Sequence, residues 1–201
     1  MAYASWLSPS KTSGSGNDTV NVSALSNNTG RNARSTTVTF KAANCEDVAR
    51  TVNQLGKPET SAIQSTAASE KTGGTVTITG TSNSSKLTFS LGTGDLTLTL
   101  PASYTAGGVS TTNGAAISGD PGATQEYTFS IAFTVPSNTS TSAQSRQIIV
   151  TDNAGTAHTC TLTLAAGDAY LTVSSVSGDI PWDASSNVSF TVTSNTNWTV
   201  V

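Results

Sequence analysis

Charged side chains are scarce in this sequence of 201 residues. Lys and Arg number 9, Asp and Glu number 12, and charged residues make up 10% of the chain, against roughly 25% in an ordinary soluble domain. The formal net charge is −3, and no basic cluster offers the positive surface that nucleic acids and anionic membranes attract. No apolar run approaches the ~18 residues of a membrane-spanning helix. The composition therefore argues against nucleic-acid binding and against membrane insertion.

Histidine and cysteine are also nearly absent. His158 is the one histidine, and Cys45 and Cys160 are the two cysteines. A single imidazole leaves few routes to acid–base catalysis or zinc binding, and we expect two reduced thiols. Three aspartates that could suggest calcium lie in turn sequences, where the carboxylate caps its own backbone: Asp120, Asp152 and Asp179. The sequence thus predicts no enzyme, no metal and no cofactor.

Threonine, serine and valine are abundant instead, and they alternate. Apolar and hydroxyl side chains exchange places at every second position, which is typical of strands with one buried face. The alternating segments are residues 19–23, 36–40, 75–79, 96–100, 127–135, 147–151, 160–164 and 189–193. Turn sequences rich in Gly, Asn and Asp separate them. We therefore predict an all-β fold of tandem, immunoglobulin-like antiparallel β-sandwiches.

Three segments do not show this alternation clearly. Residues 44–56 fit either a capped helix or a strand paired with the preceding one, and periodicity slightly favours the helix. Residues 57–71 are small and polar, which indicates a linker or a short helix. Residues 101–125 are rich in Gly, Ser and Thr and form a long loop in this interpretation.

A short pattern occurs twice: Asn-Thr, a spacer, Arg, and a strand that ends in Val-Thr or a close variant. It begins at Asn28 and again at Asn138. Together with Ser5-Trp6, the Ser13–Gly16 turn and Val52–Gly56, it resembles the BACON family of immunoglobulin-like domains. Members occur in Bacteroidetes proteins and in virion proteins of crAss-like bacteriophages. The resemblance implies that residues 48–54 form a closing strand, which replaces the helical interpretation.

The resemblance divides the chain into three parts. Residues 1–57 look like a BACON-like module without its first strands, and residues 58–168 like a divergent complete module with a long loop at 101–125. Residues 169–201 look like the first strands of a further module. Either the polypeptide continues after Val201, which we prefer, or these strands complete the N-terminal module of a neighbouring subunit.

Aromatic residues supply the candidate sites. The resemblance implies that Trp6 and Trp198 are structural core residues. Trp182, near a Pro, and Tyr104, in the long loop, are the candidates for stacking on a glycan or a partner surface.

The first functional hypothesis is a structural virion protein of a Bacteroidetes phage, on the capsid as a head fibre or decoration protein. Residues 1–9 do not read as a secretory signal peptide, which suits assembly in the host cytoplasm. The expected partners are other virion proteins and further copies, for example in a trimer. The alternative is a carbohydrate- or mucin-binding adhesion module at a cell surface or outside the cell. A third is a hydrolase fragment whose catalytic domain lies elsewhere.

Overall fold

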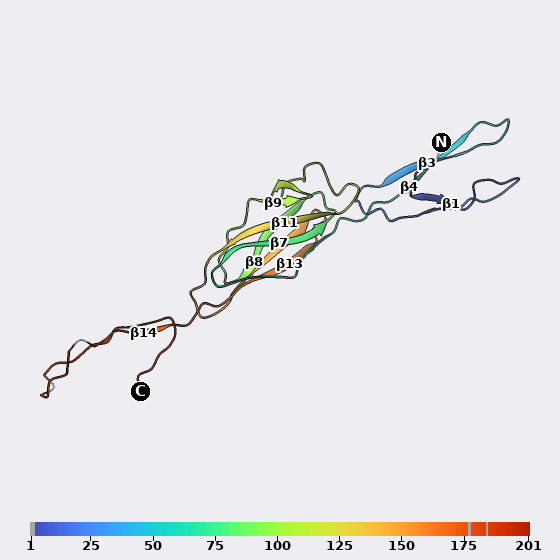
Figure 1. The fold of residues 1–201 in the computed structure, drawn as a ribbon. Helices are drawn as coiled ribbons and strands as arrows, with labels where there is room; N and C mark the ends of the chain where they lie inside the picture. The colour runs from blue at the N-terminus through green and yellow to red at the C-terminus, as the bar shows by residue number, and fades with distance from the viewer. Residues whose placement is uncertain (1–2, 177, 184) are drawn as a thin grey trace.

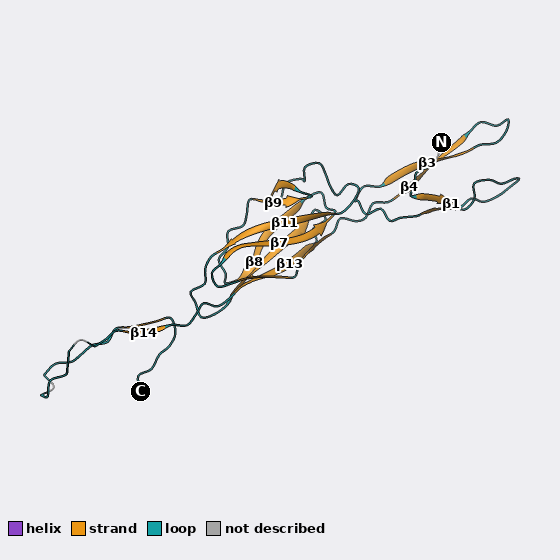
Figure 2. Ribbon diagram, viewed as in Figure 1, coloured by secondary structure: helices purple, strands orange, loops and turns teal. Residues whose placement is uncertain are grey.

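The computed structural model describes residues 3–176, 178–183 and 185–201, and these form fifteen strands and no helix. Nothing in this part of the chain is a helix that could cross a membrane. The predicted all-β class is confirmed, and most strand pairs are antiparallel. The molecule is elongated: a central sandwich carries thinner β-segments that project from its two opposite ends (Figures 1 and 2).

The central sandwich consists of two sheets packed face to face. A five-stranded sheet has the order β10-β9-β11-β7-β5, and a four-stranded sheet has the order β6-β13-β12-β8. The strands are β5 (Ser61–Ile63), β6 (Thr66–Ser69), β7 (Gly74–Ser82), β8 (Leu87–Gly94), β9 (Ser103–Ala106), β10 (Val109–Thr112), β11 (Tyr127–Val135), β12 (Gln144–Asp152) and β13 (Ala157–Leu164). Strand β6 pairs with β13 in parallel, and the other pairs in these two sheets are antiparallel.

Alternation along the strands builds the core of this sandwich. In β11 every second side chain is buried: Tyr127, Phe129, Ile131, Phe133 and Val135. Residues between them point outward as Thr, Ser or Ala. The opposite sheet contributes Phe89, whose ring packs against that of Phe129 edge to face at 5.6 Å. Each large side chain buried in this way contributes about 1.5–3 kcal/mol, so the central sandwich has the core of an independent domain.

The N-terminal module has half of such an arrangement. Its strands are β1 (Leu7–Pro9), β2 (Val22–Ala24), β3 (Arg34–Phe40) and β4 (Val48–Gln54). They form two separate two-stranded sheets, β1-β2 and β3-β4. Leu7 and Val38 are its buried hydrophobic residues, whereas Phe40 is 45% exposed. The module therefore buries little apolar surface within the single chain.

The C-terminal segment is a hairpin of β14 (Leu171–Val173) and β15 (Val192–Ser194). Its apolar side chains lie largely in solvent: Tyr170, Leu171, Val173, Val176, Ile180, Trp182, Phe190, Trp198, Val200 and Val201. In the part of the chain that the structure describes, no second layer covers this hairpin (Figure 1).

The repeat seen in the sequence is also a repeat of geometry. The side-chain amide of Asn28 donates to backbone carbonyls four and 27 residues further on, at 2.7 and 3.3 Å. Asn138 donates at the same two spacings, at 2.8 and 2.9 Å. Strands β3 and β4 of the N-terminal module thus correspond to β12 and β13 of the central sandwich.

All three unclear segments contain strands. Residues 48–54 form β4, as the resemblance implied. Residues 57–71, predicted to be a linker or short helix, contain the short edge strands β5 and β6. The predicted loop 101–125 contains the hairpin β9-β10, whose Gly107-Gly108 turn has φ values of 55° and 84°, as a type I′ turn requires.

One predicted strand is wrong. Residues 96–100 leave the sheet after Gly94, and their apolar residues pack against the core from a loop. The Asp95 carboxylate accepts a bond from the Ser145 amide at 2.8 Å, which lowers the pKa of Asp95. Alternation in residues 96–100 therefore reflects packing against the sandwich without strand pairing.

Tyr127 provides a test of the central core. Its hydroxyl donates to the Ser84 carbonyl at 2.8 Å, and burial raises its pKa to about 12, from about 10 in an unfolded chain. The folded state keeps the neutral phenol, so stability present below about pH 10 is lost as the pH rises toward about 12. Tyr127→Phe should cost about 1–3 kcal/mol at neutral pH and flatten this alkaline loss.

Chemical denaturation followed at several pH values measures both effects. Tyr170→Phe is the matched control, because Tyr170 is half exposed and should change neither quantity. Equal alkaline slopes in the two variants would contradict the assignment to Tyr127.

Candidate functional site

Tyr104 is a core residue, and the prediction that it stacks on a ligand is corrected. It lies in β9 and is 3% exposed. Its ring packs against Phe89, with centroids 4.9 Å apart, and burial raises the pKa of its hydroxyl. The sequence placed it in a loop because the hairpin that carries it was not recognised.

Trp182 is the opposite case. It lies between β14 and β15 and is 99% exposed, so both faces of the indole are free to contact another molecule. Hydrogen bonds from the side-chain hydroxyl of Ser185, and from its backbone amide at 3.2 Å, lower the pKa of the neighbouring Asp183 carboxyl. Trp182 and Tyr104 lie in different parts of the chain, and the structure does not bring them together.

The two tryptophans predicted as core residues are not buried within one chain. Trp6 is partly buried beneath the Arg34 guanidinium, which lies 4.8 Å from the ring centroid. Trp198 is 49% exposed. The resemblance implied a complete module around each of them, and the described residues of a single chain supply only part of it.

The acidic and metal-ligating residues remain dispersed. Asp152 ends β12 and its carboxylate accepts the Thr156 amide at 2.9 Å, as expected of a turn. Cys45 is exposed and Cys160 is buried, and both are free thiols. Over residues 3–176, 178–183 and 185–201, no three His, Cys, Asp or Glu side chains gather as metal ligands would.

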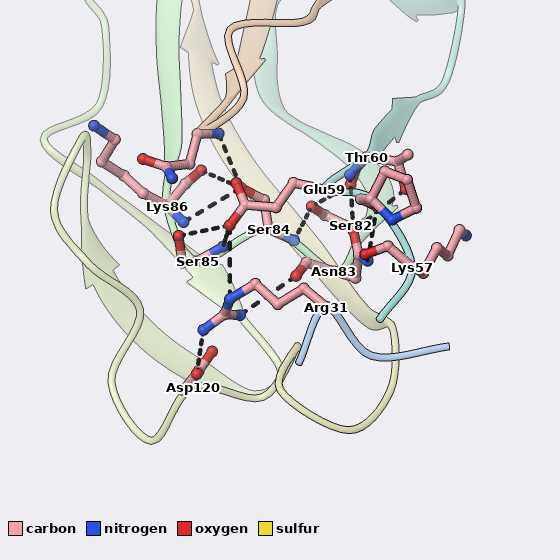
Figure 3. Close-up of polar contacts among 12 residues, drawn as sticks. Arg31, Lys57, Glu59, Thr60, Ser82, Asn83, Ser84, Ser85, Lys86 and Asp120 are labelled. Atoms are coloured by element: carbon pink, nitrogen blue, oxygen red, sulfur yellow. Dashed lines mark hydrogen bonds and ion pairs between the residues drawn. The ribbon is translucent and has the colours of Figure 1, made fainter. Parts of the chain in front are cut away.

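Polar side chains concentrate instead where the N-terminal module meets the central sandwich. Arg31, in the loop between β2 and β3, forms an ion pair with Asp120 (Figure 3). Its Nε lies 3.6 Å from a carboxylate oxygen of Glu59. Its guanidinium also donates to the Asn83 carbonyl at 3.4 Å. One cation thus links two carboxylates and a backbone carbonyl of the central sandwich, and we call this cluster the first joint.

Glu59 is fixed by hydroxyl groups of the same joint. Its carboxylate accepts bonds from the Ser84 hydroxyl at 3.2 Å and the Ser85 hydroxyl at 2.9 Å (Figure 3). The side chains of Arg31 and Glu59 are only 15% and 16% exposed. Partial burial strengthens such an ion pair and also makes each partner costly to remove.

Backbone segments approach one another closely across the joint. The Arg31 amide donates to the Gly122 carbonyl at 3.1 Å. A β-carbon on Gly30 would lie 2.4 Å from the Ala123 carbonyl oxygen, and one on Gly122 would lie 2.4 Å from that of Asn83. Only glycine fits at both positions, so the two parts are packed against each other and not merely connected.

Asn83 closes the joint from the inside. It is fully buried, its side-chain oxygen accepts the Thr60 amide at 2.8 Å, and its amide donates to the Pro58 carbonyl at 3.1 Å. These bonds hold the connecting residues against the end of β7. Sequence reasoning missed Arg31, Glu59 and Asn83. In a chain with so few charges, a Lys-Pro-Glu connection and an Arg after Asn-Thr-Gly were the available signals.

A second joint connects the central sandwich to the C-terminal hairpin. The amide of Asn195 donates to the Thr139 and Asp168 carbonyls, at 3.1 and 2.8 Å, and Asp168 pairs with Lys71. Asn195 therefore has the position relative to β15 that Asn83 has relative to β7. In both joints an asparagine at the end of a strand donates to backbone carbonyls of the segment that connects two modules. The repeat therefore includes the connections between the modules.

The surface of the described residues includes a hollow on the central sandwich and another on the N-terminal module. One, of ≈ 430 Å³, lies over β7, β9 and β11 and is lined mostly by Thr, Ser and Gly. The other, of ≈ 490 Å³, lies within the N-terminal module, between the Ser13–Gly16 turn and the end of β3 near Phe40. Its lining combines apolar side chains such as Val38 and Phe40 with the charged side chains of Lys11, Asp18 and Lys41.

Arg31→Met should loosen the first joint. The substitution keeps most of the length of the side chain but leaves Glu59 and Asp120 facing each other without a cation, at a cost of about 1–3 kcal/mol. Small-angle X-ray scattering should show a broader distribution of maximum dimensions, while the central sandwich still unfolds in one cooperative thermal transition. Arg50→Met is the control, because Arg50 is exposed and its guanidinium donates to the carbonyl of its neighbour Ala49. Superimposable scattering curves for both variants would contradict a stiffening role for Arg31.

A family model matches the N-terminal part of the chain. None of the curated proteins compared matches the chain. Residues 1–55 match the model of the BACON family, described as "Putative binding domain, N-terminal". That range covers β1 to β4 and the loop that carries Arg31. The resemblance to BACON domains is therefore confirmed for the N-terminal module.

Proposed function

We propose that this protein is a non-enzymatic structural protein, a stiff spacer of β-sandwich modules within a larger protein assembly. The observation that carries the proposal is the first joint. This joint brings together three charged side chains, Arg31, Glu59 and Asp120, in a chain in which charged residues make up only 10%. Close backbone contacts at Gly30 and Gly122 accompany them. A flexible tether between independent modules needs none of these contacts.

The shape supports the same function. Modules follow one another along a line, with the N-terminal and C-terminal segments at opposite ends of the central sandwich (Figure 1). Outer faces rich in Thr, Ser and Asn carry little charge. Such a rod holds two attachment points at a fixed distance, which suits a fibre or a decoration on a particle.

For the assembly itself, we propose the virion of a Bacteroidetes phage, with the chain on the capsid surface as a head fibre or decoration protein. The partners would be capsid or appendage proteins and further copies of this chain. The support is the confirmed resemblance of residues 1–55 to BACON domains, because the family includes virion proteins of crAss-like phages.

Fractionation of a culture that carries the gene tests the assembly. Mass spectrometry of purified virions should detect peptides from the whole sequence at a constant ratio to the major capsid protein. Recovery of the chain from the cell envelope or the medium, with none in the virions, would contradict a virion role and would leave the spacer function open.

A second candidate function is adhesion to carbohydrate or mucin. One observation favours it: Trp182 presents a fully exposed indole, and aromatic faces pack well on the apolar faces of sugar rings. The family description as a binding domain agrees with it, although Trp182 lies outside the matched residues.

Binding to immobilised mucin and to a glycan array tests adhesion. Trp182→Ala should weaken binding about tenfold, the effect of losing ~1.4 kcal/mol of contact energy. Ile180→Ala removes another exposed apolar side chain of the same segment and should leave binding unchanged. Absence of binding by the unaltered chain, or equal loss in both variants, would exclude a glycan site at Trp182.

A further inference from the structure

Two strands of the N-terminal module have an unpaired edge where their counterparts in the central sandwich are paired on both sides. In the central sandwich, β11 lies between β9 and β7, and β12 lies between β13 and β8. The corresponding N-terminal strands have one neighbour each among the described residues: β2 pairs with β1, and β3 pairs with β4. The free edge of β2 corresponds to the side on which β7 pairs with β11. The free edge of β3 corresponds to the side of β8.

The C-terminal hairpin reproduces the strands that are missing there. In the central sandwich, the Ser82 hydroxyl donates to the Thr60 carbonyl at 2.7 Å, and the side-chain oxygen of Asn83 accepts the Thr60 amide at 2.8 Å. In the C-terminal segment, Ser194-Asn195 makes the same two bonds with Tyr170, at 2.9 and 3.0 Å. Strand β14 therefore corresponds to β5, and β15 to the end of β7. The residues from Trp198 onward correspond to the start of β8.

The apolar faces on both sides are uncovered. Phe190 precedes β15 at the position that Ile78 has in β7; Phe190 is 58% exposed and Ile78 is fully buried. On the N-terminal module, Phe40 corresponds to Val150 of β12, which is also fully buried. Each end of the molecule thus exposes the apolar face that the other end would cover in a complete sandwich.

Within one molecule, these two ends are separated by the length of the central sandwich (Figure 1). The N-terminal module therefore cannot be completed by its own C-terminal hairpin while both joints stay formed. A second copy of this chain carries strands with the required sequence pattern at its other end.

We propose that residues 168–201 of one copy complete the N-terminal module of a second copy by strand addition. Strand β15 pairs with the free edge of β2, and the residues after Trp198 pair with the free edge of β3. Backbone hydrogen bonds along both edges and burial of Phe190 and Phe40 drive the association. The inference deepens the proposed spacer function and rests on it, since it names the partner as another copy.

The contact is head to tail, because each copy gives a hairpin at one end and accepts one at the other. Such heterologous contacts propagate into open chains or closed rings. Complete sandwiches would then alternate along the rod, one formed within a copy and the next shared by two copies. Trp198, half exposed in the single chain, would become part of a core.

Mass measurement on the 201-residue chain tests the proposal. Light scattering after size exclusion should show species at multiples of 20.3 kDa that grow with protein concentration. Phe190→Asp with Val192→Asp places charges on the inward face of β15 and should give a monomer. Thr191→Asp with Thr193→Asp places the same charges on the outward face of the same strand and should leave association intact.

Mixing two defective copies shows whether the contact is head to tail and whether the variants are still folded. Val20→Asp with Val22→Asp blocks the accepting face of β2, while the Phe190/Val192 variant blocks the hairpin. Each variant should be monomeric alone, and an equimolar mixture should give a 1:1 dimer, because each retains one intact end. An unaltered chain that stays monomeric at all concentrations, association that the Phe190/Val192 variant does not reduce, or a mixture without dimers would overturn the proposal. None of these results bears on whether virions contain the chain, so the two proposals can fail separately.

Discussion

The structure depends on one constraint: strands need hydrogen-bonding neighbours, and the apolar face of a sheet needs a cover. The central sandwich satisfies this constraint within the chain. Its middle strands β11 and β12 are paired on both sides, and Phe89, Phe129 and Ile148 are enclosed between the two sheets. The N-terminal module and the C-terminal hairpin leave it unsatisfied, at opposite ends of one rod. Backbone groups at free edges and exposed apolar side chains favour association with a matching strand. Polymerisation through the ends follows from the same physics that closes the middle.

The scarcity of charged residues and the structure of the two joints are related, because several of the few charged side chains lie at the joints. A surface of Thr, Ser and Asn carries few ionic groups, so the charges that exist can be placed where modules meet. Arg31 joins two carboxylates at the first joint, and Asp168 pairs with Lys71 at the second. Both joints also use an asparagine, Asn83 or Asn195, to hold the connecting backbone. A spacer needs such joints, because flexibility at any one connection makes the distance between its two ends variable.

Much of the fold could be predicted from the sequence, because alternation along strands such as β11 and β12 reports which face is buried. The closing strand β4 needed the family resemblance, since a strand covered on neither side has no strong pattern. The short strands β5, β6, β9 and β10 escaped prediction because their residues are mostly small or polar and show no clear alternation. Tyr104 was misplaced for that reason. The contacts of the first joint could not be predicted, because Arg31 and Asp120 are distant in sequence and only the packing of two modules brings them together.

Amide hydrogen exchange measured over a range of protein concentrations tests the central claim most directly. If copies complete one another, amides of β2, β3 and β15 gain protection as the concentration rises, while those of β11 and β12 are protected throughout. Protection of β2, β3 and β15 that does not change with concentration would contradict the account.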